Sequence, residues 1–142
     1  MSQENAQQFI HRLYERWNTE GIRSIAEDFF DARIVYHDDA VWPGGGVHNG
    51  RPAMIARFRE VVETLGVTES VVERVVETKD GVAWVIRATG RSPGAEVPHD
   101  HRWGYVGRID GGKLVYFRAY YDADDALRAV EADGEGDDVG EH

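Results

Sequence analysis

Four side chains that could do chemistry stand at strict two-residue spacing: His99, His101, Trp103 and Tyr105. Alternate residues of a β-strand point to the same face, so a strand over this stretch places all four in one row. The row is too polar for an ordinary core and too aromatic for an ordinary solvated surface. It is typical of the wall of a pocket.

A second candidate lies at the end of a predicted strand over residues 33–38, where Tyr36 and Asp38 share one face. A carboxylate shielded from water by aromatic side chains becomes a stronger base, and an imidazole gains and loses a proton near neutral pH. If both project into one cavity, Asp38 can abstract a proton and His101 can return it. Tyr36 or Tyr105 would donate a hydrogen bond to the developing oxyanion. The combination is typical of isomerisation, dehydration or aldol-type cyclisation.

Each of these residues also has a purely structural interpretation. Asp38 can cap a loop at the end of a strand, and His101 can be a hydrogen-bonded histidine in a polar part of the core. Further aromatic side chains at inward positions can line a cavity or simply fill a core, and Ala119 would widen the cavity. The predicted substrate-binding residues are Tyr14, Trp42, Phe58, Trp84, Trp103, Tyr105, Phe117, Ala119 and Tyr121.

Neither a metal nor a cofactor is expected. His99 and His101 form an H-x-H pair, but no third ligand stands at a suggestive spacing. The run Gly44-Gly45-Gly46 lacks the G-x-G-x-x-G pattern and the lysine of a phosphate-binding loop, and it is interpreted as a flexible cavity rim. Trp42 and His48, on either side of this run, are possible lid residues.

The charge is concentrated at one end of the chain. The 142 residues carry a formal charge of −10, and residues 131–142 contain six acids and no Lys or Arg. The rest has 16 basic and 20 acidic residues, a net charge of −4, which argues against binding to nucleic acid or to an anionic membrane. With no cysteine, no signal peptide and no long apolar run, the chain is expected to be cytoplasmic.

The spacing of apolar residues predicts three helices before most of the sheet. Helical stripes run over residues 9–17, 22–30 and 54–65, and the short strand 33–38 separates the second from the third. Residues 40–52, rich in glycine and proline, are expected to form a loop. The chain then shows four long strands with period-two patterns, over 67–80, 82–92, 99–110 and 113–122.

This order indicates one α+β domain over residues 1–130. Three N-terminal helices pack on one side of an antiparallel sheet, and glycines within the strands indicate strong curvature, so that sheet and helices enclose a cone. Asp122 is a suitable N-cap for a short closing helix. Residues 131–142 are expected to be an acidic, disordered tail.

Three stretches carry a resemblance to a known family: "FFDARIVYHDD", "GGGVHNGRPAMIARFR" and "HRWGYVGRIDGGKLVYFRAYYDADDAL". Over residues 5–130 the chain resembles the SnoaL-like branch of the nuclear-transport-factor-2-like (NTF2-like) superfamily. This resemblance implies a cone with a small-molecule pocket and a homodimer formed through the outer face of the sheet. The family includes polyketide cyclases, ketosteroid isomerase, scytalone dehydratase, limonene-epoxide hydrolase and small-ligand binders.

The chain departs from the catalytic patterns of these relatives. The polyketide cyclases and the epoxide hydrolase carry a catalytic aspartate where this chain has Ala119, so their usual mechanisms are not available. The general base of ketosteroid isomerase lies where this chain has Asp38. The first-helix tyrosine of that enzyme aligns with Leu13 rather than with Tyr14.

Three functions are compatible with the sequence. The first is a cofactor-free acid–base enzyme (isomerase, cyclase or dehydratase type) acting on a small carbonyl or polycyclic substrate. The second is a non-catalytic binding module for a small apolar ligand, and the Ala119 substitution favours it. The third is an interaction domain whose partner docks on the outer face of the sheet.

Overall fold

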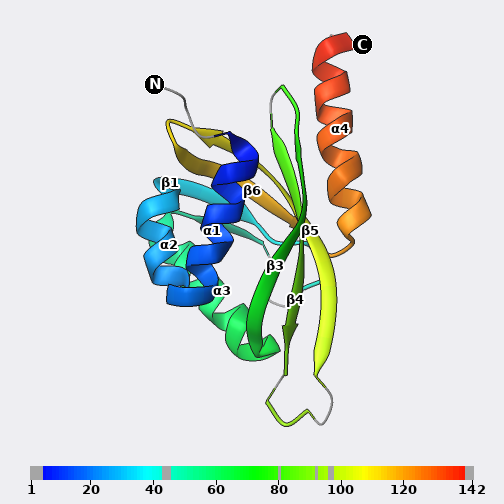
Figure 1. Cartoon of the computed structure of the whole chain (residues 1–142). Coiled ribbons are helices and arrows are strands. Elements are labelled where there is room, and N and C mark those ends of the chain that lie inside the picture. The colour runs from blue at the N-terminus through cyan, green and yellow to red at the C-terminus, as the bar shows by residue number, and fades with distance from the viewer. Residues whose placement is uncertain (1–4, 43–45, 80, 92, 96–97, 140–142) are drawn as a thin grey trace.

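The computed structural model describes residues 5–42, 46–79, 81–91, 93–95 and 98–139. Residues 43–45, in the predicted rim, and 140–142, in the predicted tail, lie outside this description. The described residues form four helices and six strands (Figure 1): α1 Ala6–Glu20, α2 Ile22–Phe29, β1 Phe30–His37, β2 Val47–Asn49, α3 Arg51–Leu65, β3 Val67–Glu77, β4 Val82–Gly90, β5 His99–Asp110, β6 Lys113–Tyr120 and α4 Ala123–Val139.

The strands form one mixed sheet in the order β2-β1-β6-β5-β4-β3. The predicted antiparallel pairing is found for four of the five pairs of neighbouring strands in this sheet, and β1 pairs with β6 in parallel. Parallel neighbours cannot be joined by a tight turn, and β1 and β6 are separated along the chain by α3 and three long strands. The sequence analysis also missed β2, which pairs with β1 inside the predicted loop; three residues are too few to show an alternating pattern.

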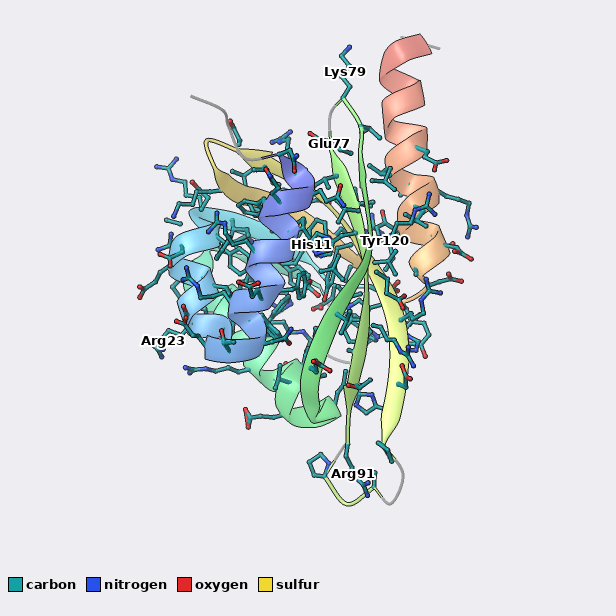
Figure 2. The ribbon with its side chains drawn as sticks, in the orientation of Figure 1. His11, Arg23, Glu77, Lys79, Arg91 and Tyr120 are labelled. Atoms are coloured by element: carbon teal, nitrogen blue, oxygen red, sulfur yellow. The ribbon has the colours of Figure 1, made fainter. Side chains whose placement is uncertain are left out.

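Helices α1, α2 and α3 cover one face of the curved sheet, here called the inner face, as Figure 1 shows. Helix α1 begins with a capping box, in which Asn5 and Gln8 satisfy each other's backbone N–H groups. Its predicted apolar stripe is buried: Phe9, Ile10 and Leu13 are at most 3% exposed. Figure 2 shows the side chains that fill the space between these helices and the sheet.

Helix α4 covers the opposite, outer face of the sheet over β4 and β5 (Figure 1). The expected cap is present, since Asp122 Oδ1 accepts a hydrogen bond from the backbone N–H of Asp124 at 2.9 Å. Ala126 and Val130 are buried against Ala83 and Val106 of the sheet. The helix is longer than predicted and runs through residues 131–139 of the segment expected to be disordered. Once a helix has been nucleated, each further residue adds one backbone hydrogen bond, which favours extension beyond the predicted end. The domain boundary at residue 130 stays a prediction.

Within the described residues, no helix combines the length and the apolar character needed to cross a membrane.

Gly104 allows α4 to approach β5, which generates a test of the fold. A Cβ atom at this position would lie 2.6 Å from Ala126 Cβ, so Gly104→Ala is expected to destabilise the protein by about 1–3 kcal/mol through overpacking. The measurement is the midpoint of urea unfolding. The control is Gly104→Ala/Ala126→Gly, which removes the opposing methyl group. If the double variant is no more stable than the sum of the two single variants predicts, the close contact is not the cause.

Candidate functional site

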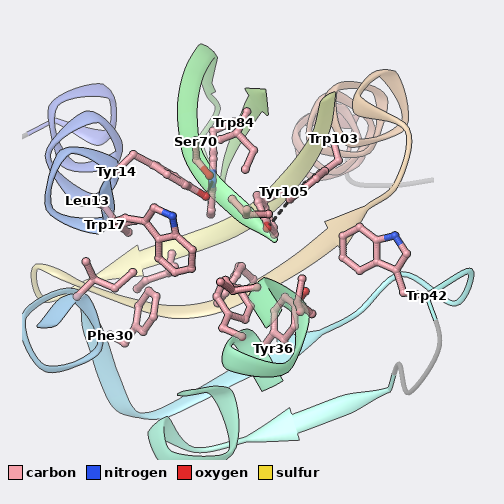
Figure 3. A pocket seen from close by; sticks show the side chains of 18 residues that line it. Leu13, Tyr14, Trp17, Phe30, Tyr36, Trp42, Ser70, Trp84, Trp103 and Tyr105 are labelled. Carbon is pink, nitrogen blue, oxygen red and sulfur yellow. Dashed lines mark hydrogen bonds between the residues drawn. The ribbon is translucent and has the colours of Figure 1, made fainter. Parts of the chain in front are cut away.

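A pocket lies between the N-terminal helices and the inner face of the sheet (Figure 3). Its cavity volume is about 40 Å³, which is space for about three waters, since one needs roughly 10–15 Å³. The walls are Leu13, Tyr14, Trp17, Ile25, Phe30, Tyr36, Trp42, Phe58, Val61, Val62, Val67, Ser70, Trp84, Ile86, Trp103, Tyr105, Leu114 and Phe117.

The walls differ in how firmly they are packed. The sheet side chains Trp84 and Tyr105 are at most 4% exposed, whereas Trp17, Trp42 and Phe58 are half-buried. Trp17 and Phe58 meet edge to face across the space between α1 and α3, with ring centroids 5.9 Å apart. A molecule of several rings can enter only if these half-buried side chains move, because the cavity is too small for it.

Most of the predicted site residues surround this pocket. The eight that line it are Tyr14, Tyr36, Trp42, Phe58, Trp84, Trp103, Tyr105 and Phe117. The other four lie beside it: Asp38 and Ala119 are buried, His101 is half-buried and Tyr121 is 47% exposed. The alternation along β5 therefore places Trp103 and Tyr105 in the pocket wall and His101 further out along the same strand.

Two tyrosine hydroxyls face the pocket as hydrogen-bond donors. Trp84 Nε1 donates to Tyr14 Oη at 3.0 Å, and Trp103 Nε1 donates to Tyr105 Oη at 2.8 Å (Figure 3). Because each phenolic oxygen already accepts an indole N–H, its own hydrogen is left to donate elsewhere. A ligand oxygen that accepts hydrogen bonds would therefore suit this part of the pocket.

Burial keeps these phenols neutral. It raises the pKa of Tyr14 well above the usual value, and the neighbouring Tyr105 raises it further. Burial also raises the pKa of Tyr105, against the lowering effect of the Trp103 hydrogen bond and with a further increase from Asp38. Burial is again the largest cause for Tyr36, whose pKa Tyr105 and Asp38 raise further. All three phenols are thus donors at neutral pH.

Asp38 follows β1 and points to the inner face of the sheet. In the β1–β6 register Tyr36 is matched with Phe117 and His37 with Arg118, so Asp38 comes next, opposite Ala119. The Asp38 side chain has no exposed surface. The carboxylate therefore arises from β1, beside the β6 position at which the resemblance implies a catalytic aspartate in the cyclases.

Two side chains hold the carboxylate of Asp38 at the same oxygen. Its Oδ2 accepts a hydrogen bond from His48 Nε2 at 2.8 Å and from Arg57 Nε at 2.8 Å. Its Oδ1 is buried and has no hydrogen-bond partner. Arg57 is itself buried, 5% exposed at the side chain, and its Nη1 lies 2.6 Å from Glu60 Oε1. One oxygen of a buried carboxylate is left bare, which is costly unless a ligand donor satisfies it.

The structure gives Asp38 a different histidine neighbour from the predicted one. His101 stacks on Tyr121, with centroids 4.5 Å apart, and its Nε2 lies 3.3 Å from the Tyr121 carbonyl oxygen. It also lies beside Trp103, which Trp42 meets edge to face at 5.6 Å. These aromatic groups mark one end of the pocket, whereas the imidazole that contacts Asp38 is that of His48.

Arg57 is a residue that sequence reasoning missed, although a signal was present. It falls on the same helical face as Met54, Phe58 and Val61, and an arginine among apolar residues at that spacing indicates a buried partner of opposite charge. The contact of His48 with Asp38 depends on the unpredicted strand β2, where His48 is matched with Tyr36.

Trp17 and Ser70 also line the pocket without having been predicted. Ser70 is held by Asn18, whose side-chain amide donates to the Ser70 carbonyl at 2.8 Å and accepts from the Ser70 N–H at 2.9 Å. This double contact ties α1 to β3 beside the pocket. Among the residues that the structure describes, no group of three His, Cys, Asp or Glu could hold a metal ion.

The fold and the pocket together define the class of protein. The four helices and the curved, unclosed sheet are those of the NTF2-like cone, with an aromatic pocket in its interior. The family description "SnoaL-like domain" matches residues 10–117, and the chain belongs to this family. No curated protein matches the sequence.

Solved structures support the same fold at low sequence identity. Bal32a, from a soil-derived mobile gene cassette, is 23% identical over 87% of this chain and 94% of its own, with a TM-score of 0.69. A protein from Mesorhizobium loti, described as a SnoaL-like polyketide cyclase, is 16% identical to this chain. The match covers 83% of this chain and 100% of the other, with a TM-score of 0.66. A protein with a ketosteroid isomerase-like fold from Catenulispora acidiphila, solved in complex with trimethylamine, is 17% identical over 89% of this chain and 95% of its own, with a TM-score of 0.67.

The raised pKa values of the buried phenols lead to a prediction of how the free energy of unfolding depends on pH in the alkaline range. A raised pKa means that Tyr105 keeps its proton in the folded protein when the unfolded chain, with a pKa of about 10.0, begins to lose it. The free energy of unfolding is therefore expected to fall as the pH rises above about 10. Tyr105→Phe should show a smaller fall, measured by urea unfolding at pH 8 to 11. The control is Tyr121→Phe, at an exposed position, which should behave as the wild type. Equal slopes in all three proteins would contradict the prediction.

Proposed function

We propose that this protein binds a small, largely apolar carbonyl compound and catalyses a cofactor-independent proton transfer, with Asp38 as the general base. The observation that carries the proposal is the bare, buried Oδ1 of Asp38 on the inner face of the sheet. Neutral phenols whose hydrogens are free to donate lie in the same interior. A base and an oxyanion donor in a water-poor site are the two elements that enolisation requires.

The reaction that these groups support is simple. Asp38 Oδ1 takes a proton from the carbon next to the substrate carbonyl, and the electron pair of the C–H bond moves onto the carbonyl oxygen. The Tyr105 and Tyr14 hydroxyls donate hydrogen bonds to the enolate that forms. Return of the proton to another carbon isomerises the substrate, and attack of the enolate on a second carbonyl group closes a ring. The role of His101 as a returning acid stays a prediction.

A second candidate function is binding without chemistry. The small cavity and the engagement of Asp38 by Arg57 and His48 favour it, because an ion-paired carboxylate is a weaker base. In this case the same polar groups only orient a ligand. The two functions share the pocket and differ in whether a bound molecule exchanges protons.

Exchange of hydrogen for deuterium separates these functions. The wild-type protein is incubated in D2O with small cyclic ketones and enones (cyclohexanone, cyclohex-2-enone, 1-indanone and 1-tetralone), and loss of the α-C–H signals is followed by proton NMR. We expect catalysed exchange with at least one ketone, and Asp38→Asn should slow it by about 100-fold or more, because it removes the base.

The matched control is Asp100→Asn. Asp100 is an exposed aspartate paired with Arg87 on the outer face, so this variant should exchange as the wild type does. If ketones bind to the wild type but exchange no faster than in buffer, the enzyme proposal is wrong and the binding module is supported. If Asp38→Asn keeps the full rate, Asp38 is not the base.

A homodimer through the outer face of the sheet is part of the proposal, and α4 restricts where it can form. The helix occupies that face over β4 and β5, so a second copy would contact the outward side chains of the other strands. Two of these, Val71 on β3 and Val47 on β2, are 48% and 53% exposed. Analytical ultracentrifugation is expected to show a dimer that Val71→Asp weakens, with the exposed Val41→Asp as the control. A monomer at all concentrations would contradict the proposal.

A further inference from the structure

We infer that Arg57 and His48 are positioning residues that hold Asp38 by one oxygen and leave the other open to the bound molecule. The inference rests on the proposed role of Asp38 as the base. Neither residue was assigned this role from the sequence, and neither lines the pocket among the described residues. Both would act on the reaction only through Asp38.

The geometry of the contacts is asymmetric. Two donors from different elements, His48 Nε2 on β2 and Arg57 Nε on α3, converge on Oδ2 at 2.8 Å each. A carboxylate can accept at both oxygens, yet Oδ1 has no partner although it is fully buried. Because two donors fix Oδ2 from two directions, rotation of the carboxylate about its Cβ–Cγ bond would break both hydrogen bonds.

Each of the two donors is itself held in place. Arg57 Nη1 is anchored by Glu60 Oε1 one helical turn further along α3. The ring of His48 stacks on Tyr36, with centroids 5.9 Å apart and an angle of 27° between the planes. Since ionised Asp38 can only accept, His48 must carry a hydrogen on Nε2, which leaves Nδ1 as the acceptor when the ring is neutral.

Charged and polar side chains from several elements surround Asp38. The groups that face it are Tyr36 on β1, His48 on β2, Arg57 on α3 and, more distantly, Tyr105 on β5; Glu60 acts through Arg57. Burial alone would lower the pKa of Arg57, but its hydrogen bonds to Glu60 and Asp38 and their charges raise it instead. The guanidinium is therefore a permanent counter-charge. It lies at Oδ2 and not at Oδ1, the oxygen that is proposed to take the proton.

The test measures Asp38 directly and needs no substrate. Protein labelled with 13C at the aspartate carboxyl groups is titrated, and the Asp38 signal is identified by its loss in Asp38→Asn. We expect Arg57→Gln to move the Asp38 titration midpoint upward by about one pH unit or more, because a neighbouring cation is lost. Arg57→Lys keeps the charge and should recover most of the shift. His48→Gln, which can still donate, should shift the midpoint less than His48→Leu.

The control for a general effect on α3 is Arg51→Gln. Arg51 stands on the same helix, but its Nη2 donates to the Phe30 carbonyl and not to a carboxylate, so the Asp38 midpoint should stay where it is in the wild type. An unchanged midpoint in folded Arg57→Gln, or an equal shift in Arg51→Gln, would overturn the inference.

If Arg57→Gln does not fold, a measurement on the wild-type protein tests whether Arg57 contacts Asp38 as inferred. The Arg57 Nε–H signal in a proton–nitrogen NMR spectrum should move with the same midpoint as the Asp38 carboxyl signal. Separate midpoints would overturn the inference. The proposed function is tested separately. If Asp38→Asn exchanges ketone protons at the full wild-type rate, the proposed function is wrong, but the arrangement of Arg57 and His48 around Asp38 is unaffected.

Discussion

The burial of one ion pair, Asp38 with Arg57, is the constraint on which the interior depends. Of the fifteen residues in α3, only Met54 and Arg57 are buried, so the ion pair is a principal link between this helix and the sheet. A buried charge is tolerated only beside its partner, and removing one partner typically costs about 3–5 kcal/mol. The position of α3 and the burial of Asp38 therefore depend on each other.

The same interaction explains the shape of the pocket. The ion pair fixes α3 near its middle, while Phe58, Val61 and Val62 lie half-buried along the pocket side of the helix. The sheet supplies the opposite wall, in which the indole N–H groups of Trp84 and Trp103 both donate to tyrosine hydroxyls. The pocket thus has one firm wall that carries its polar groups and one wall that can yield to a ligand. Such a division suits a protein that must admit an apolar molecule and then hold one polar end of it.

Local periodicity was sufficient to predict much of this arrangement. Alternation along β5 placed Trp103 and Tyr105 on the inner face, and the helical spacing of α1 placed Tyr14 beside them, because each pattern depends only on neighbours in the chain. Contacts between distant elements were not accessible in this way. The pairing of Asp38 with Arg57 depends on how α3 crosses β1, and that with His48 depends on a strand of three residues.

The position of His101 shows the same limit of local patterns. Alternation states which face a side chain takes but not how far along the strand the pocket extends, so His101 lies on the expected row beyond the residues that line the cavity. The parallel pairing of β1 with β6 is likewise a property of the whole chain path. No stretch of either strand encodes it alone.

The contact between Asn18 and Ser70 has a consequence for how the protein behaves in a crowded solution. Strand β3 is the last of the sheet, and its free edge would be a template on which a strand from another molecule could add. The Asn18 amide occupies both backbone hydrogen-bonding groups of Ser70 and so imitates one residue of a neighbouring strand. This edge is closed at that point by the molecule's own first helix, which guards the sheet against growth into an aggregate.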